Sequence, residues 1–419
     1  MSTLTEADVR ASAGAERPAY RDGNVLRWLS AYATSMVGDS VYFGALSWAA
    51  ARSGSPGQAG LVLAVGAVPR ALLMLGGGVL ADRFGPRRVV IGSDAARCLV
   101  ILAVAGVLLV TAPGVWLLAL VALVFGAVDA LFLPAVGALP PRVTEPGQLA
   151  RVQGMRGLAA RIALITGAPL GGLAVAVGGS AAAFGVAGVL FAVSLVLLVA
   201  VRLRPLPAGG PASSDGATGW RQLVDGLRYI RRHRVLFPLM IVIAVAEFGF
   251  SGPANIGLVL LAEERGWGAS GMGWIIAGFG VGAGAASLLV AVRGRVGRAG
   301  AALSWLSLVG ASGLAALAYA PSVWVAALVG AFTGALLGLA GALCGALLQT
   351  VSDAAYLGRV TSVSTLFTLG VAPLCYPLVG AAVGVWGCGP VFGVGAAICG
   401  ASGMMGLGFG ALRRAELPK

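Results

Sequence analysis

Charged and metal-binding side chains are scarce in this chain of 419 residues. Only 11% of the residues are charged, and histidine and lysine occur once each, at His233 and Lys419. The five cysteines are scattered singly, with no CxxC or HExxH spacing: Cys98, Cys344, Cys375, Cys388 and Cys399. An odd set of isolated cysteines gives no disulfide framework. We therefore expect neither a bound metal nor a resident cofactor.

Hydrophobic residues make up 58% of the chain, and the mean hydropathy of +0.92 excludes a single soluble core. Because about 20 apolar residues cross a bilayer as a helix, the composition predicts an all-α, polytopic membrane protein. Apolar runs between charged or Gly/Pro breaks predict twelve spans, near residues 25–50, 57–80, 89–111, 115–137, 158–178, 182–201, 236–262, 271–292, 299–319, 322–346, 360–384 and 389–411.

The net charge of +13 comes almost entirely from arginine, and the distribution of arginine along the chain predicts the membrane orientation. Of the 29 basic residues, Arg70, Arg97 and Arg161 fall inside expected spans, and Arg52 and Arg265 lie in connections on one side. The other 24 lie on the opposite side. Since basic residues accumulate on the cytoplasmic side, we expect a multi-pass protein of the cell inner membrane with both termini cytoplasmic. The positive charge then reflects the orientation of the protein in the membrane, and nucleic acid is not an expected partner.

The chain is expected to divide once, at a Pro/Gly/Ser-rich stretch after residue 201. Trp220, Leu223 and Leu227 among the arginines that follow predict an amphipathic helix on the inner membrane surface. The expected parts are a cytoplasmic tail (1–24), a six-helix bundle (25–201), a cytoplasmic linker with this helix (202–235), a second six-helix bundle (236–411) and a cytoplasmic tail (412–419).

The two halves resemble copies of one another. Three short sequences recur in the same order at nearly constant offset: Arg83-Phe-Gly85 as Arg295-Val-Gly297, Leu149-Ala-Arg151 as Leu357-Gly-Arg359, and Ala168-Pro169 as Ala372-Pro373. Such repetition indicates duplication, and two similar bundles that face one another suggest alternating access. We expect the protein to be a monomer in the lipid bilayer, since its two halves already face each other.

A charged motif follows the second expected span. It contains Gly78, Asp82, Arg83, Gly85, Arg87 and Arg88. Gly78 permits close helix approach, Gly85 a tight turn, and the charges a network that two conformations can break and remake. The motif resembles the signature loop of the major facilitator superfamily, with Pro86 as one added residue. The resemblance implies two pseudo-symmetric six-helix bundles and a transporter rather than an enzyme.

Further segments are similar to the macrolide-efflux and enterobactin-exporter branch of that superfamily. They are Gly38-Asp39, Asp94-Ala-Ala-Arg97, Phe132-Leu-Pro134-Ala135 and Gly226-Leu-Arg228-Tyr229. The fifth span carries Gly167, Pro169, Gly171 and Gly172, similar to the motif of proton-coupled exporters but one residue shorter. Its physical role would be a helix bend with close packing. Alternatively, these glycines serve only helix packing and have no part in proton coupling.

Intramembrane charges are the candidate proton or substrate sites, because a charge at mid-span costs at least about 2.5 kcal/mol. Asp39 and Arg70 lie at similar depth, so we expect them to pair. Asp129 and Arg161 are expected to pair across neighbouring helices, and Asp94 to pair with Arg97 on one helix face. Glu247, near the position equivalent to Asp39, has no evident basic partner.

Together these features predict a secondary active transporter. The resemblance implies proton-coupled export of a lipophilic drug or natural product, with a small molecule as substrate and the proton gradient as energy source. Proton-coupled uptake or exchange of a metabolite is the alternative. An intramembrane enzyme is a remote alternative, because the chain has no G-x-S-x-G element, and a non-transporting receptor on the same fold is another. The chain also has no nucleotide-binding loop for ATP-driven pumping.

Overall fold

The computed structural model describes residues 19–112, 114–144, 148–203, 219–293, 297–353 and 356–416, and within these ranges it contains helices and no strand. The elements are η1 (Ala19–Arg21), α2 (Gly23–Ser53), α3 (Pro56–Phe84), α4 (Pro86–Val110), α5 (Val115–Gly137), α6 (Pro140–Val143), α7 (Leu149–Ala200), α8 (Gly219–Arg232), α9 (Leu236–Gly252), η3 (Pro253–Gly257), α10 (Leu258–Glu264), α11 (Gly268–Arg293), α12 (Ala299–Ala318), α13 (Val323–Val351), α14 (Leu357–Gly370), α15 (Ala372–Trp386), α16 (Cys388–Gly408) and α17 (Gly410–Arg413).

Twelve membrane spans are formed from these helices. Ten of the described segments are long and apolar enough to cross a bilayer, and one of them, Arg151–Ala200, is about twice the necessary length. It is divided at Gly178 and Gly179, where Gly179 has a φ of +69°, so α7 is two spans joined by a tight turn. The 31-residue α2 is the remaining span. The predicted count of twelve is therefore confirmed.

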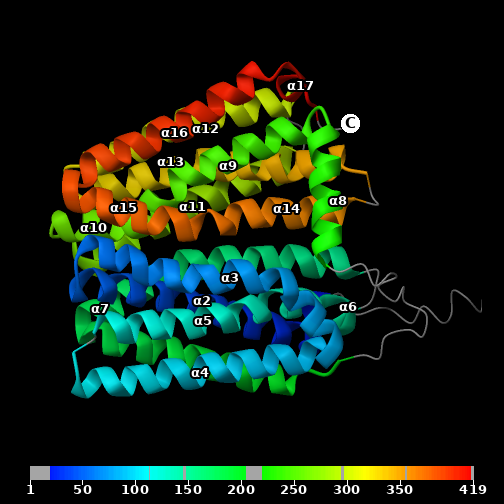
Figure 1. Ribbon diagram of the computed structural model, residues 1–419. Coiled ribbons are helices and arrows are strands. Elements are labelled where there is room, and N and C mark those ends of the chain that lie inside the picture. Colours follow the sequence, from blue (N-terminus) through cyan, green and yellow to red (C-terminus); the bar gives the residue numbers. More distant parts are fainter. Residues whose placement is uncertain are drawn as a thin grey trace, which may run out of the picture.

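The spans form two bundles that lie side by side (Figure 1). The N-terminal half contains α2 to α7 and the C-terminal half α9 to α16. Helix pairs recur in the two halves: α3 packs on α5 as α11 packs on α13, and α4 packs on the second span of α7 as α12 packs on α16. This recurrence agrees with the duplication that the sequence indicates.

Glycine at the α3–α5 and α11–α13 crossings lets backbones touch. A Cβ atom at Gly126 would collide with the carbonyl oxygen of Gly66, and one at Gly334 with that of Phe279. In a bilayer, helices associate through such close van der Waals packing, because lipid supplies no hydrophobic drive. The same device thus holds the equivalent pair in each half.

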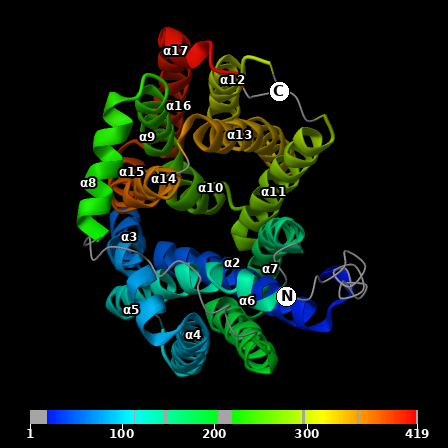
Figure 2. The ribbon, with the colours of Figure 1, turned by 90° about the vertical axis from the view of Figure 1, so that its right-hand side faces the viewer.

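The two halves share one apolar core at one end of the molecule and have separate cores at the other. The shared core includes Val41 and Phe125 from the N-terminal half and Val259 and Phe392 from the C-terminal half. At the opposite end, one cluster belongs to the N-terminal half and another to the C-terminal half. We call the first the closed end. The second, which carries most of the described arginines, is the arginine-rich end. Figure 2 views the helices from this end.

Backbone contacts seal the closed end. A Cβ atom at Gly60 of α3 would meet the carbonyl oxygen of Tyr376 in α15, and one at Gly380 of α15 would meet that of Pro56. Across the other seam, Gly172 of α7 lies against the carbonyl oxygen of Ala269 in α11. At these points the backbones of the N-terminal and C-terminal halves touch directly.

Helix α8 runs across the helix ends at the arginine-rich end rather than along them (Figure 1). The Tyr229 hydroxyl donates a hydrogen bond to Asp353 Oδ2 at 3.0 Å and accepts one from the Asp353 backbone N–H at 3.2 Å. The Tyr229 ring stacks on Tyr356 with centroids 4.3 Å apart. The helix expected after the central linker is therefore attached to the C-terminal half, while residues 204–218 lie outside the described ranges.

Replacing Gly126 with leucine should destabilise the protein by about 1–3 kcal/mol or more, because the new side chain must separate α3 from α5. We expect a lower thermal midpoint in detergent and a smaller monodisperse fraction on size exclusion. Gly106→Leu is the matched control, since a Cβ atom at exposed Gly106 of α4 meets nothing within 4 Å. Equal midpoints for the two variants would contradict this account of the crossing.

Candidate functional site

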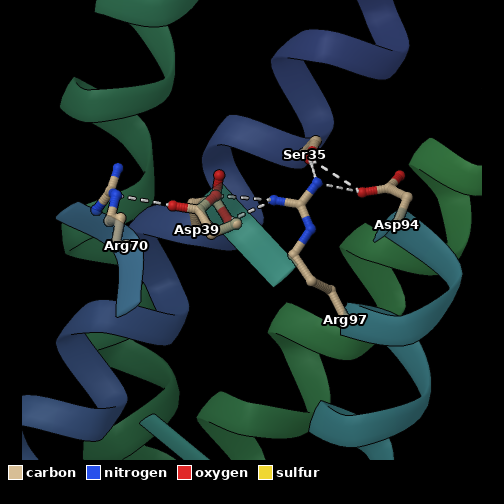
Figure 3. A network of polar contacts seen from close by, with 6 residues as sticks. Ser35, Asp39, Arg70, Asp94 and Arg97 are labelled. Atoms are coloured by element: carbon tan, nitrogen blue, oxygen red, sulfur yellow. Dashed lines mark hydrogen bonds and ion pairs between the residues drawn. The ribbon is translucent and has the colours of Figure 1, made fainter. Parts of the chain in front are cut away.

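Five charged side chains form a network inside the N-terminal half (Figure 3). They come from four helices: Asp39 from α2, Arg70 from α3, Asp94 and Arg97 from α4, and Asp129 from α5. We call this set the buried charge network. Each member would be costly in the bilayer alone, so the helices bring opposite charges together.

Arg97 is the centre of the buried charge network. Its side chain is fully buried, and its guanidinium lies 2.5 Å from Asp94, 3.0 Å from Asp39 and 3.5 Å from Asp129. Arg97 also donates to the Ser35 hydroxyl at 3.0 Å, and that hydroxyl donates to Asp94 at 3.2 Å. One guanidinium therefore ties α2, α4 and α5 together through charge-assisted contacts.

Aromatic rings enclose the Arg97 guanidinium on its remaining sides. The ring centroids of Phe132, Phe191 and Phe125 lie 3.7, 4.9 and 6.0 Å from its central carbon. A cation over the face of an aromatic ring is attracted by the quadrupole of the ring, and more strongly where water is excluded. The rings thus support the positive charge and separate it from the lipid.

Arg70 connects the buried charge network to a cavity. Its Nε lies 2.9 Å from Asp129 Oδ2, its guanidinium lies 5.4 Å from the Phe43 ring centroid, and its side chain is 28% exposed. Arg70 also lines a cavity of about 380 Å³ between the two halves, together with Phe43, Asn255 and Tyr376. We call this the central cavity. A ligand in the central cavity that contacts Arg70 would therefore touch the residue that pairs with Asp129.

Two of the ion pairs expected from the sequence are wrong. Arg70 pairs with Asp129 instead of Asp39, and Asp39 pairs with Arg97. Arg161 has no ion pair with Asp129, which faces Arg70 and Arg97. The expectations compared depths counted from helix ends, which ignores tilt and the length of an arginine side chain. The Asp94–Arg97 pair is confirmed, although it belongs to a wider network.

A second cavity, of about 530 Å³, lies toward the arginine-rich end, and we call it the inner cavity. Arg161 of α7 lines it from the N-terminal half, and Glu247 of α9 lines it from the other. Phe250 and Phe279 line both cavities, with ring centroids 5.7 Å apart. These two rings stand between the compartments. Among the described residues, no group of three His, Cys, Asp or Glu is arranged to hold a metal.

The charged motif after the second span is described in part. Gly85 has a φ of +84°, the left-handed conformation that its turn between α3 and α4 requires. Arg87 donates to the carbonyl oxygen of Val199 at 2.9 Å, and Arg88 is exposed. Gly78, Asp82 and Arg83 belong to the end of α3, where the side chains of 74–83 lie outside the described part. The expected charge network of this motif stays a prediction.

The glycines of the fifth span pack in two directions. Gly167 lies against Ser40 and Gly171 against Val41, both on α2, while Gly172 faces α11 of the other half. Pro169 lies inside α7, and a Cβ atom at Gly273 of α11 would meet its Cα at 3.0 Å. This segment therefore forms both a helix contact within one half and part of the seam between halves.

The sequence did not reveal the central position of Arg97 or the part played by Ser35. A usable signal existed, because Ser35 lies one helical turn before Asp39, so both point to one face of α2. The four aromatic residues around the charges carry no such signal, since the chain is apolar throughout. Phe43, Phe250 and Asn255 line the central cavity.

Comparisons with known proteins agree with this architecture. The Major Facilitator Superfamily profile matches residues 28–260. The multidrug efflux pump Tap of Mycobacterium tuberculosis (strain ATCC 25618 / H37Rv) is 29% identical, over 84% of this chain and 86% of that protein. The nucleoside transporter NupG has a similar fold, with a TM-score of 0.71 at 13% identity over 94% of this chain and all of that one.

A bacterial homologue of the human lysosomal transporter Spinster, solved in an inward-facing and unoccupied conformation, has a TM-score of 0.64 at 15% identity, over 94% of this chain and 96% of that one. At these identities the structural similarities show the fold alone. The family match covers more than half of the chain and agrees with the twelve spans, the paired bundles and the cavities between them. The chain belongs to the Major Facilitator Superfamily and is a multi-pass membrane transporter, not an enzyme.

Proposed function

We propose that this protein is a secondary active transporter that exports a lipophilic drug or natural product in exchange for protons. The similarity to the multidrug efflux pump Tap supports the substrate class and the direction. The observation that carries the proton coupling is the composition of the buried charge network. It holds three carboxylates and two guanidiniums within contact distance.

One carboxylate in the buried charge network thus lacks a compensating charge. A single bound proton would make the network neutral, and its release would restore one negative charge inside the bundle. Asp39 is the best placed acceptor, because its side chain is 13% exposed, whereas those of Asp94 and Asp129 are 0% and 1% exposed. Water can therefore reach Asp39 more readily than the other two.

The proton site and the substrate site communicate through Arg70 in this mechanism. Protonation of Asp39 weakens its attraction for Arg97, so that Arg97 turns toward Asp94 and Asp129. Asp129, now closer to Arg97, then attracts Arg70 less strongly, and Arg70 faces the central cavity. By thermodynamic linkage, a ligand that changes the position of Arg70 in turn changes the proton affinity of Asp39.

Alternating access follows from the two different ends of the molecule. The halves share one core at the closed end and have separate cores at the arginine-rich end. In the proposed cycle they rock about the central cavity, so that the closed end opens as the arginine-rich end closes. Phe43 and Tyr376 face the central cavity from the two halves and would contact a lipophilic substrate in both states.

The proposed setting is the cell inner membrane, with the arginine-rich end and both termini in the cytoplasm, and a monomer as the working unit. The proton gradient supplies the energy in this proposal, and no bound cofactor takes part. One charge that moves through a potential of about 150 mV releases about 3.5 kcal/mol, which supports a gradient of about 300-fold. One proton per cycle is therefore sufficient for useful export.

Asp39→Asn should abolish proton-driven export, because asparagine holds the network in its neutral state. We expect the efflux rate of lipophilic fluorescent compounds from preloaded, non-growing cells to fall about tenfold or more, to the rate seen with a protonophore. Asp225→Asn, on the exposed face of α8, is the matched control and should keep the wild-type rate. Uncoupler-sensitive efflux at the wild-type rate in Asp39→Asn at matched expression would exclude Asp39 as the coupling group.

Arg70→Gln should separate transport from coupling, because Asp129 then loses its 2.9 Å partner and the cavity loses its link to the network. In proteoliposomes we expect exchange of substrate down its own gradient to continue, while accumulation driven by a pH gradient falls to background. Arg52→Gln, an exposed arginine at the far end of α2, serves as control. Accumulation in Arg70→Gln equal to wild type would argue against this link. Uptake by wild type under an opposite gradient only would reverse the proposed direction.

A further inference from the structure

We propose that the inner cavity binds a zwitterionic amphiphile, with the acidic group of the ligand at Arg161 and its cationic group at Glu247. This inference rests on the proposed function, since the inner cavity would receive the substrate of that transporter on its way to the central cavity, and the inference names the class of that substrate. It concerns a different cavity and different charges from those assigned to proton coupling.

Arg161 and Glu247 have opposite charges and face the same cavity, but they do not form an ion pair. Neither has an ion-pair or hydrogen-bond partner among the side chains that the structure describes. The other intramembrane charges described above are all paired within the buried charge network. Among the described residues, the inner cavity therefore brings together two opposite charges that a ligand can pair with.

A ligand with both charges satisfies the cavity better than a ligand with one. An organic cation neutralises Glu247 and leaves a guanidinium in a site of low polarity, where an uncompensated charge is costly. An anion at Arg161 leaves the carboxylate in the same condition. A molecule that carries both groups forms two charge-assisted contacts and leaves neither charge unpaired.

The remaining wall fits the apolar body of such a molecule. Val242, Phe250, Phe279 and Leu337 provide apolar surface, and the cavity of about 530 Å³ lies in the range of sites for drug-sized ligands. Ser307, Ser364 and Thr368 add hydroxyl groups on the side of the C-terminal half. The combination of an apolar wall with two opposite charges is that of a site for an amphiphile.

The two charges also belong to different halves of the protein. Arg161 lies on α7 and Glu247 on α9, at the end where the halves have separate cores. A zwitterion held at both ends therefore bridges the two halves across the inner cavity. A ligand with a single charge contacts only one half by ion pairing, which gives the site a basis for discrimination.

The test uses dansyl-labelled lysine derivatives and measures binding to the purified full-length protein by dansyl fluorescence. Nα-dansyl-lysine is a zwitterion with separated charges, and Nε-dansyl-lysine is one with adjacent charges. The methyl ester of Nα-dansyl-lysine keeps only the cation. Nα-dansyl-Nε-acetyl-lysine, with a free carboxylate, keeps only the anion. We expect at least one zwitterion to bind about ten- to a hundredfold more tightly than both singly charged derivatives.

The variants assign each charge to its residue. Arg161→Gln should remove the preference of the zwitterion over the methyl ester, and Arg161→Lys should restore most of it. Glu247→Gln should remove the preference over the acetyl derivative. Arg156→Gln on the same helix, where Arg156 lies over the Tyr32 ring, and Glu263→Gln at an exposed position should behave as wild type.

Equal affinities for zwitterions and singly charged derivatives, no saturable binding of any derivative, or a preference unchanged in Arg161→Gln and Glu247→Gln would each overturn the inference. Uncoupler-sensitive efflux of lipophilic compounds from cells is measured alongside. If that efflux persists while the zwitterion preference is absent, the site assignment fails and the proposed exporter stands. If wild type shows no such efflux, the proposed function fails independently of the binding result.

Discussion

A guanidinium inside a membrane-spanning bundle must be neutralised by its neighbours, and the N-terminal half is arranged around this constraint. Arg97 contacts three carboxylates from three helices, and aromatic rings close the space around it. The positions of α2, α4 and α5 relative to one another are therefore coupled to the charge state of one cluster. A change of a single proton there acts on several helices at once, because each of them contributes a ligand to the same cation.

The two halves have similar helix packing but different charged residues. Gly126 and Gly334 perform the same packing at equivalent crossings, so the helix framework of the two halves is alike. The charges are not alike, since Asp39 belongs to a crowded network whereas Glu247, near the equivalent position, faces a cavity without a partner. In the proposed mechanism the N-terminal half thus carries the proton site, whereas the ligand in the inner cavity contacts one charge from each half.

The sequence predicted the elements of this fold well and the contacts of the site poorly. Twelve spans, two bundles and the helix after the linker follow from hydrophobic runs and arginine distribution, because the bilayer imposes length and polarity on each segment independently. Partner choice depends instead on tilt and side-chain reach. Asp39 and Arg70 were matched by depth, but the Arg97 side chain reaches Asp39 from a neighbouring helix. The local Asp94–Arg97 pair was predictable because a three-residue spacing fixes it within one helix.

The seams at the closed end have a consequence for genetics. Their closest contacts are glycine against backbone carbonyl, as at Gly60 and Gly380, and no ion pair joins the halves there among the residues that the structure describes. An alanine scan, which finds residues by removing side chains, would pass over a contact that has no side chain to remove. Mutations that hold this protein in one state are to be sought among substitutions that add atoms, and salt or pH should have little effect on how firmly this end shuts.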